Sequence, residues 1–328
     1  MNVVITGGGG FLGRKLAERL SRRGRLRGPD GNEETIERIT LVDVSPSPQS
    51  SDGRLVYVTA DIADPEVMQR LIDEDTVSIF HLAAIVSGMA EADFDLGMRI
   101  NLDATRLLLE TCRARGHRPR IVFTSSVAVY GGELPETVLE ATAVHPQTSY
   151  GTEKAIAELL IADYTRRGFV DGRMLRLPTI TVRPGRPNAA ASSFASGIIR
   201  EPLNGETAVC PVGEKARLWV MSPATVIECL IAAHDIEAGA LGVSRILNLP
   251  GLSVTVGDMV ESLARVAGRE VTSRIRFERD PRIERMVDSW PGACDASRAR
   301  ALGFPSDENF DAIVRRYIED ELAGKPSA

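Results

Sequence analysis

The stretch that decides the fold is Met1-Asn2-Val3-Val4-Ile5-Thr6-Gly7-Gly8-Gly9-Gly10-Phe11-Leu12-Gly13. Its apolar run is typical of a buried strand, and Phe11–Arg23 continues as a helix with an apolar stripe. Glycines at 7, 10 and 13 suit a tight turn, close approach of a pyrophosphate to the backbone, and close packing of the helix on the strand. A glycine motif alone is weak evidence, but between a strand and a helix it predicts a dinucleotide-binding unit.

Short apolar runs alternate with helical patterns as far as residue 180. Such runs predict a parallel sheet that is covered by helices on both faces. We therefore expect an α/β fold, with a Rossmann-type doubly wound parallel sheet over residues 1–180. The expected strands are Val3–Thr6, Ile39–Val42, Leu55–Thr59, Val77–His81, Ile121–Thr124 and Met174–Leu177, and a second helix is expected over Leu102–Arg115.

Beyond residue 180 the regular alternation stops, because proline and glycine interrupt the chain. This predicts a smaller, loop-rich substrate domain over residues 181–328, with some segments returning to the Rossmann sheet. Helical stripes recur at Ala224–His234, Val256–Ala267 and Phe310–Leu322. In the first domain, the polar stretch Gly24–Glu37 has turn signals at its centre and no hydrophobic period, so we predict an exposed insertion.

The composition excludes several classes of protein. A net charge of −6 and a pI near 5.5 argue against a nucleic-acid partner, which would select a basic face. The four cysteines form no CxxC pair, so neither a disulfide framework nor a metal site is expected. The N-terminus resembles no signal peptide, and no apolar run approaches the roughly 20 residues of a membrane span. We expect a cytoplasmic protein with no membrane partner.

Two carboxylates follow strands near the glycine turn. Asp43 comes directly after the second expected strand, where it can bind the adenosine ribose hydroxyls and repel a 2′-phosphate, which favours NAD over NADP. Its distance of 30 residues from Gly13 exceeds the usual ~20 because of the polar insertion. Asp61-Ile62 is expected to meet the adenine, and Leu82-Ala83-Ala84 to present small residues to the cofactor. Either aspartate could instead serve only a loop turn.

Tyr150 and Lys154 occupy positions i and i+4 of an expected helix and therefore share one face. A phenol with an ordinary pKa of about 10 is a poor base at neutral pH. An adjacent ammonium and a cationic nicotinamide ring would both favour the phenolate, which can accept the proton of an alcohol. Upstream, Thr124-Ser125-Ser126 supplies a hydroxyl that can hold the reacting oxygen.

These motifs, in this order, resemble the extended short-chain dehydrogenase/reductase family, a group of NAD-dependent sugar epimerases, dehydratases and dehydrogenases. The resemblance covers nearly the whole chain. It implies that Tyr150 is the general acid/base, that Lys154 binds the nicotinamide ribose and lowers the tyrosine pKa, and that Ser126 orients the substrate oxygen. It also implies a homodimer formed through the long helices that flank the sheet.

The resemblance extends to the rest of the cofactor site. Asn101 matches the family's helix-borne asparagine, although Ala104 stands where glycine is frequent. Pro178-Thr179-Ile180 matches the segment that lies against the nicotinamide carboxamide. The residues predicted to bind NAD are Gly7, Gly10, Phe11, Leu12, Gly13, Asp43, Asp61, Ile62, Leu82, Ala83, Ala84, Asn101, Thr124, Tyr150, Lys154, Pro178 and Ile180.

The residues next to the catalytic hydroxyl narrow the choice of reaction. Val127 and Ala128 stand where dehydratases carry an acid pair, so dehydration is disfavoured. The segment from Asn188 to Phe194 brings small, weakly polar side chains to the expected substrate region, which suits a compact ligand. Residues 183–197 and 289–295 resemble the branch of the family that oxidises the sugar acid D-erythronate at C2. The alternatives are a nucleotide-sugar 4-epimerase, a dehydrogenase of L-threonine or another hydroxy acid, and a non-catalytic NAD sensor.

A small sugar acid requires a cation for its carboxylate and polar partners for its hydroxyls. Arg183 and Arg217 are the candidates for the carboxylate, because a guanidinium can pair with it in a bidentate manner, although either could be a surface ion pair. The residues predicted to bind substrate are Ser87, Ser125, Ser126, Tyr150, Thr179, Arg183, Ser192 and Arg217.

Overall fold

The computed structural model describes residues 1–46, 50–185 and 192–322. Its chain forms two compact units, each assembled from three segments. The first contains Met1–Ser126, Thr148–Arg176 and Ile227–Leu247, and the second contains Val127–Gln147, Leu177–Val226 and Asn248–Ala328.

The first unit is built on a seven-stranded sheet whose strand order is β12-β8-β7-β6-β1-β4-β5. β1 lies between β4 and β6 and is parallel to both, so the crossover expected of a doubly wound fold is present. The α/β fold predicted from the apolar runs is confirmed. The strands are β1 (Asn2–Thr6), β4 (Arg38–Asp43), β5 (Leu55–Thr59), β6 (Thr76–His81), β7 (Arg120–Ser126), β8 (Asp171–Leu177) and β12 (Ile246–Asn248).

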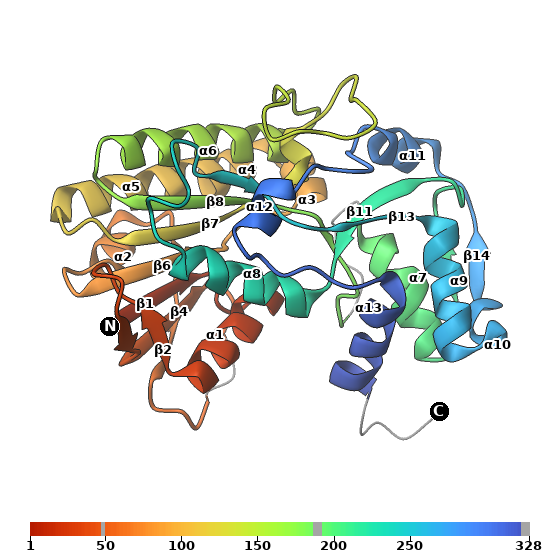
Figure 1. Ribbon diagram of the computed structural model, residues 1–328, viewed down its shortest axis with the longest axis horizontal. Helices are drawn as coiled ribbons and strands as arrows, with labels where there is room; N and C mark the ends of the chain where they lie inside the picture. Colours follow the sequence, from red (N-terminus) through yellow and green to blue (C-terminus); the bar gives the residue numbers. More distant parts are fainter. Residues whose placement is uncertain (47–49, 186–191, 323–328) are drawn as a thin grey trace. The chain divides into compact units, whose positions relative to one another are not determined.

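Helices cover both faces of this sheet, with α5 and α6 on one face and α1 and α8 on the other (Figure 1). The core beneath α5 and α6 includes Ile79, Leu108 and Ile161, all buried. α1 ends at Gly24, whose φ of 68° is in the left-handed region that glycine adopts readily. The helical elements are α1 (Phe11–Arg23), α2 (Pro65–Leu71), α3 (Ser87–Ala92), α4 (Phe94–Gly97), the π-helical turn Met98–Asp103, α5 (Ala104–Arg115), α6 (Ser149–Arg166) and α8 (Pro223–Asp235).

The insertion predicted to be exposed and without a hydrophobic period is instead a short hairpin that packs on the unit. Its strands are β2 (Arg25–Arg27) and β3 (Glu33–Thr35), which pair in antiparallel fashion. Leu26 and Ile36 are fully buried. Two apolar residues ten positions apart in the chain produce no period, so the sequence pattern could not reveal that both point inward.

The second unit contains small sheets and a helical layer. β11 (Arg217–Met221) lies between β9 (Thr179–Ile180) and β13 (Leu252–Thr255), while β10 (Ala208–Cys210) pairs with β14 (Ile275–Phe277). Its core includes Ile198, Met259 and Val314. The remaining helical elements are Val127–Val129, α7 (Ser193–Leu203), α9 (Val256–Ala267), α10 (Arg269–Thr272), α11 (Pro281–Asp288), α12 (Ser297–Ala301), α13 (Phe310–Tyr317) and the turn Ile318–Leu322.

Among the described residues, no helix combines the length and the apolar character needed to cross a membrane. The four cysteines, Cys112, Cys210, Cys229 and Cys294, are all buried and none forms a disulfide bond. Cys112 lies on the buried side of α5.

Two buried histidines predict that the folded state is sensitive to acid. Burial lowers the pKa of His81 to about 3 and that of His234 to about 4, from an ordinary value near 6.5. Between these values the unfolded chain binds more protons, so the free energy of unfolding falls as pH decreases from about 6.5 to about 4. We expect about 1.4 kcal/mol per pH unit from each histidine, measured by denaturant unfolding. H234Q removes one of the two titrating histidines, so it should lower this slope by about 1.4 kcal/mol per pH unit. An unchanged slope would contradict the prediction.

Candidate active site

The glycine turn forms a cradle that side chains would fill. Gly7 has a φ of 69°, and a Cβ on it would meet the backbone nitrogen of Ala83 at 2.8 Å. A Cβ on Gly13 would collide with the carbonyl oxygen of Gly7. α1 begins immediately after Gly10 and has no acidic residue in its first turn, so its unpaired N–H groups suit an anion. The turn therefore fits the pyrophosphate of a dinucleotide.

Asp43 lies beside this turn at the carboxyl end of β4. Its Oδ2 accepts a hydrogen bond from the backbone N–H of Gly9 at 3.2 Å, and its Oδ1 accepts one from Ser45 at 3.0 Å. The structure thus brings the predicted ribose partner next to the predicted pyrophosphate turn. A carboxylate in this position suits NAD, because it would repel the additional phosphate of NADP.

The other residues predicted to contact the adenine side have defined places. Asp61 accepts a hydrogen bond from Ala63 N–H at 2.9 Å and pairs with Arg99 at 2.6 Å. Asp61 therefore does stabilise a turn, which the sequence had left open. Its contact with the cofactor stays a prediction. Ile62 is buried, and Leu82 donates its N–H to the carbonyl oxygen of Thr6 at 3.2 Å.

A chain of buried hydrogen bonds runs from the glycine turn to α6. Thr6 Oγ1 lies 2.6 Å from His81 Nδ1, and His81 Nε2 lies 3.0 Å from Thr105 Oγ1. Thr105 donates its hydroxyl proton to the carbonyl oxygen of Asn101 at 2.8 Å. We therefore assign the proton of neutral His81 to Nε2, with Nδ1 accepting from Thr6. His81 is therefore a packed residue at the end of its strand.

Asn101 continues this chain to the residue before the lysine. It lies in the π-helical turn, and its Nδ2 donates to Glu153 Oε2 at 2.6 Å and to the carbonyl oxygen of Ile85 at 3.0 Å. Its Oδ1 accepts from the N–H of Ile85 at 2.7 Å. The side chain predicted to bind the cofactor thus holds the backbone after β6 against α6.

Tyr150 and Lys154 share the first turns of α6, as their spacing predicted. Thr148 caps this helix by accepting a hydrogen bond from Gly151 N–H at 3.1 Å. Lys154 is 1% exposed, and its Nζ lies 4.5 Å from the ring centroid of Phe123 and 5.7 Å from that of Tyr150. Burial lowers the pKa of Lys154 to about 8, and the charges of Glu153 and Glu158 oppose this shift. Lys154 therefore remains mainly a cation at neutral pH.

A buried ion pair lies next to the serines that end β7. Glu158 Oε1 accepts the hydroxyl proton of Ser125 at 2.5 Å, and Glu158 Oε2 lies 2.7 Å from Arg176 Nη2. Both charged side chains are at most 5% exposed. Ser125, predicted to bind substrate, therefore has its hydroxyl turned to a structural carboxylate. Ser126 is partly exposed at the strand end, and Thr124 donates to the carbonyl oxygen of His81 at 3.2 Å.

The remaining predicted substrate residues are spread over both units. Ser87 begins α3 in the first unit, while Thr179 lies on β9 of the second, where Pro178 precedes it. Arg183 receives a hydrogen bond at its carbonyl oxygen from Arg200, and Ser192 immediately precedes α7. Asn188 and its neighbours through Ala191 lie outside the described residues.

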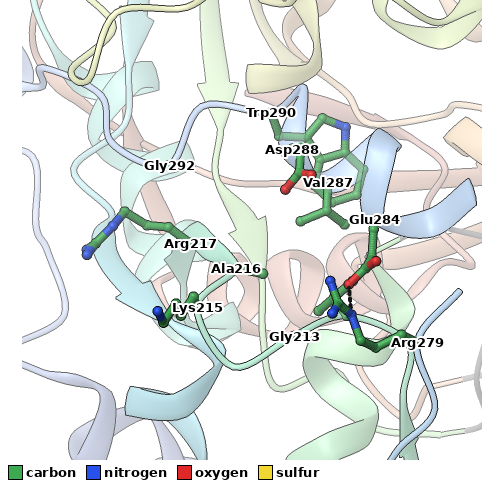
Figure 2. Close-up of a pocket in the computed structure, with 11 residues that line it drawn as sticks. Gly213, Lys215, Ala216, Arg217, Arg279, Glu284, Val287, Asp288, Trp290 and Gly292 are labelled. Atoms are coloured by element: carbon green, nitrogen blue, oxygen red, sulfur yellow. Dashed lines mark hydrogen bonds and ion pairs between the residues drawn. The ribbon is translucent and has the colours of Figure 1, made fainter. Parts of the chain in front are cut away.

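Arg217 belongs to a charged pocket of about 410 Å³ in the second unit. Figure 2 shows Arg217 and Lys215 on one side of this pocket and Arg279, paired with Glu284, on the other. Trp290 and Asp288 complete its wall, and Arg217 Nη1 donates to Ser253 Oγ at 3.2 Å. Arg183 is not among the residues that line it. The two candidate arginines therefore lie in different surroundings, and the role of each stays a prediction.

Sequence reasoning missed the carboxylates that support the lysine. Glu158 lies four residues after Lys154, so the helical spacing that paired Tyr150 with Lys154 also places Glu158 on that face. Glu153 gives no such signal, because a charged residue adjacent to a functional one is usually exposed. Its full burial depends on Asn101, which is distant in sequence.

Comparison with known proteins assigns the family. Residues 3–241 match the NAD dependent epimerase/dehydratase family. The chain belongs to this family. It is 58% identical to a D-erythronate dehydrogenase of Cupriavidus necator over 98% of both chains. It is 48% identical to a D-erythronate dehydrogenase of Haemophilus influenzae, over 98% of this chain and 100% of that one.

A solved structure leads to the same family. A structure described as the nucleoside-diphosphate-sugar epimerase from Agrobacterium tumefaciens has a TM-score of 0.93 and 45% identity, and the match covers 99% of this chain and 95% of that one. Family membership and these relatives make the chain an NAD-dependent oxidoreductase. The glycine cradle and Asp43 fit the cofactor that the family name specifies.

D43N tests the place given to the ribose. Loss of a charged acceptor should raise the KM for NAD about 10- to 100-fold, and loss of negative charge should improve the ratio of NADP to NAD turnover. Steady-state kinetics with both cofactors measures this. D30N, which changes an exposed aspartate of the β2–β3 hairpin, is the matched control and should leave both values unchanged. An unaltered cofactor ratio in D43N would refute the assignment.

Proposed function

We propose that this enzyme oxidises D-erythronate at C2 to 2-oxo-tetronate (2-dehydro-D-erythronate), with NAD as the oxidant. The main support for this substrate is the 58% identity, over nearly the full length of both chains, to a protein named for that activity. The chemistry is supported by the ammonium of Lys154, buried in the same face of α6 as the Tyr150 ring.

In this proposal Tyr150 removes the proton of the C2 hydroxyl. Lys154 makes the phenol a better proton acceptor because its positive charge, 5.7 Å from the ring centroid, stabilises the phenolate. Glu153 and Glu158 support this role because their charges oppose the loss of the lysine proton. The bound NAD would receive the hydride from C2. Ser126 would hold the reacting oxygen while the proton leaves.

Most of the residues proposed to hold the cofactor belong to the first unit. Its pyrophosphate would lie on the turn of Gly7, Gly10 and Gly13, and its adenosine ribose on Asp43. Lys154 would serve the nicotinamide ribose. Pro178 and Ile180 would serve the nicotinamide carboxamide, as the family resemblance implies.

The substrate carboxylate is assigned to Arg217 in preference to Arg183. Arg217 lies in a pocket that also contains Lys215, and both side chains are cationic (Figure 2). The positive charge on this side suits a sugar acid and gives a bidentate partner for its carboxylate. Ser87, Thr179 and Ser192 remain the proposed partners of the substrate hydroxyls.

The proposed setting is the cytoplasm, with the enzyme acting as a homodimer. Four buried cysteines without a disulfide bond are in keeping with a reducing compartment. The dimer follows from the family resemblance, which places the subunit contact on the helices that flank the sheet.

Y150F is the first test of the mechanism. Removing the phenolic hydroxyl should lower kcat about 10²- to 10⁴-fold, while NAD affinity, measured by fluorescence titration, should stay within a factor of about three.

The substrate is tested in the wild type by the appearance of NADH with D-erythronate, threonate isomers, L-threonine and UDP-sugars. Net NADH from D-erythronate supports the proposal. If no acid yields NADH and a UDP-sugar is interconverted, the proposal is wrong and the protein is an epimerase.

R217M tests the carboxylate partner. Losing a charged bidentate contact should lower kcat/KM for D-erythronate about 10- to 100-fold. R276M, in strand β14 of the same unit and outside the lining of the pocket, is the matched control and should keep wild-type kinetics. If R183M abolishes turnover while R217M does not, the carboxylate belongs to Arg183.

A further inference from the structure

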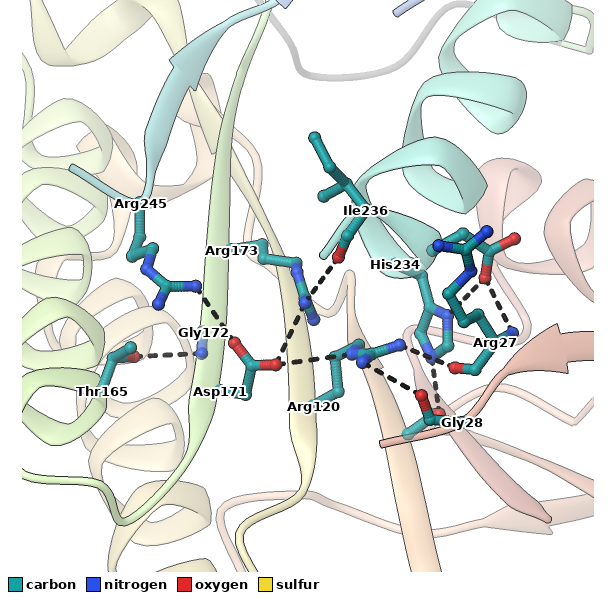
Figure 3. A network of polar contacts seen from close by, with 12 residues as sticks. Arg27, Gly28, Arg120, Thr165, Asp171, Gly172, Arg173, His234, Ile236 and Arg245 are labelled. Atoms are coloured by element: carbon teal, nitrogen blue, oxygen red, sulfur yellow. Dashed lines mark hydrogen bonds and ion pairs between the residues drawn. The ribbon is translucent and has the colours of Figure 1, made fainter. Parts of the chain in front are cut away.

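Three arginines surround one carboxylate at the amino ends of the strands in the first unit. Arg120 begins β7, Arg173 lies on β8, and Arg245 precedes β12. Their guanidinium nitrogens lie 3.5, 3.0 and 3.3 Å from the carboxylate oxygens of Asp171 (Figure 3). The glycine turn and Tyr150 lie at the carboxyl ends of the strands, so this cluster takes no part in the candidate active site.

The cluster carries an excess of buried positive charge. The side chain of Arg173 is 1% exposed, and those of Arg120 and Arg245 are 10% and 16% exposed. Guanidinium groups remain protonated in proteins, so three cations face the single charge of Asp171. The next carboxylate, Asp235, is already paired with Arg23 and receives a hydrogen bond from His234. Asp171 therefore cannot balance the charge of all three arginines.

Arg173 also has hydrogen-bond donors with no acceptor. Its Nη2 donates to the carbonyl oxygen of Ile236 at 2.9 Å and pairs with Asp171. Within the described part of the chain, its Nε and Nη1 have no hydrogen-bond partner, and neither has Nε of Arg120. A buried donor that bonds to nothing destabilises the folded state, and a charged donor does so more strongly. Such groups in a native structure need an explanation, and one of these is a bound water or ion.

We propose that Arg173 binds a small inorganic anion of the halide class, such as chloride, inside the first unit. A water molecule could accept from the free N–H groups, but it would leave the excess of positive charge unbalanced. An anion satisfies both requirements. A halide suits a site whose donors lie wholly beneath the surface, because it has no oxygen atoms that would each require a donor.

The anion would stabilise the attachment of the β2–β3 hairpin. Arg120 donates from Nη1 to the carbonyl oxygen of Arg27 at 2.7 Å and from Nη2 towards that of Gly28 at 3.4 Å. The N–H of Arg27 donates to Asp235 at 3.0 Å. Neutralising the repulsion between Arg120 and Arg173 would strengthen these contacts. The hairpin is thus a part of the fold whose stability would depend on the anion.

The test is thermal unfolding of the full chain at constant ionic strength while gluconate is replaced by chloride. Because chloride would bind only the folded state, the melting temperature of the wild type should rise with the logarithm of chloride concentration, by roughly 3 °C or more. R173M should lose this dependence, since methionine keeps the apolar bulk without the donors. R166M, which removes a mostly exposed arginine of α6, should keep it.

A second measurement locates the anion and does not need a folded variant. Crystals of the wild type grown or soaked in bromide should show an anomalous peak within hydrogen-bond distance of Arg173. Hydrogen exchange of the amides in β2 and β3 should slow in chloride relative to gluconate. Equal melting curves in chloride and gluconate, or bromide crystals without a peak at Arg173, would overturn the proposal.

Discussion

The first unit depends on a buried row of hydrogen bonds that joins the glycine turn to the helix of Lys154. Thr6 precedes the glycine turn, and its hydroxyl reaches Thr105 through the ring of His81. Asn101 then connects this row to Glu153, the neighbour of Lys154. The row functions only if His81 is neutral, because one ring nitrogen must accept and the other must donate. Full burial, which lowers the pKa of His81 to about 3, keeps it neutral.

Lys154 lies in the same low-dielectric interior but, unlike His81, it remains mainly charged at neutral pH. Burial lowers the pKa of Lys154, and two carboxylates on its own helix oppose this shift. Glu158 is in turn held by Arg176 and by the hydroxyl of Ser125. Removing one member of a buried ion pair leaves the other charge uncompensated, which is costly. The lysine, the serine-bearing strand end and β8 are therefore coupled through electrostatics as well as through packing.

Opposite ends of one sheet thus carry different chemistry. At the carboxyl ends, the glycine turn and Asp43 fit a dinucleotide, because they offer space and a hydrogen-bond acceptor. At the amino ends, three arginines share one aspartate, and some of their donors have no partner among the residues that the structure describes. Parallel strands make this separation possible, because all the amino ends of neighbouring strands meet at one edge.

Local order in the sequence was sufficient to predict most strands of the sheet and the glycine turn between β1 and α1. The apolar runs identified β1 and β4 to β8, because burial on two faces leaves a plain signal in composition. The apolar stripes identified α1 and α5. The spacing of Tyr150 and Lys154 placed them on one face of α6, because a helix brings i and i+4 together regardless of the rest of the chain.

The tertiary structure alone decided the contacts between distant residues. Asn101 with Glu153, and Asp171 with Arg120 and Arg245, combine side chains whose separation in sequence has no fixed period. The burial of Leu26 and Ile36 likewise follows no period in the sequence. Such pairings arise only when strands and helices pack, and the burial that results determines which charges need a partner.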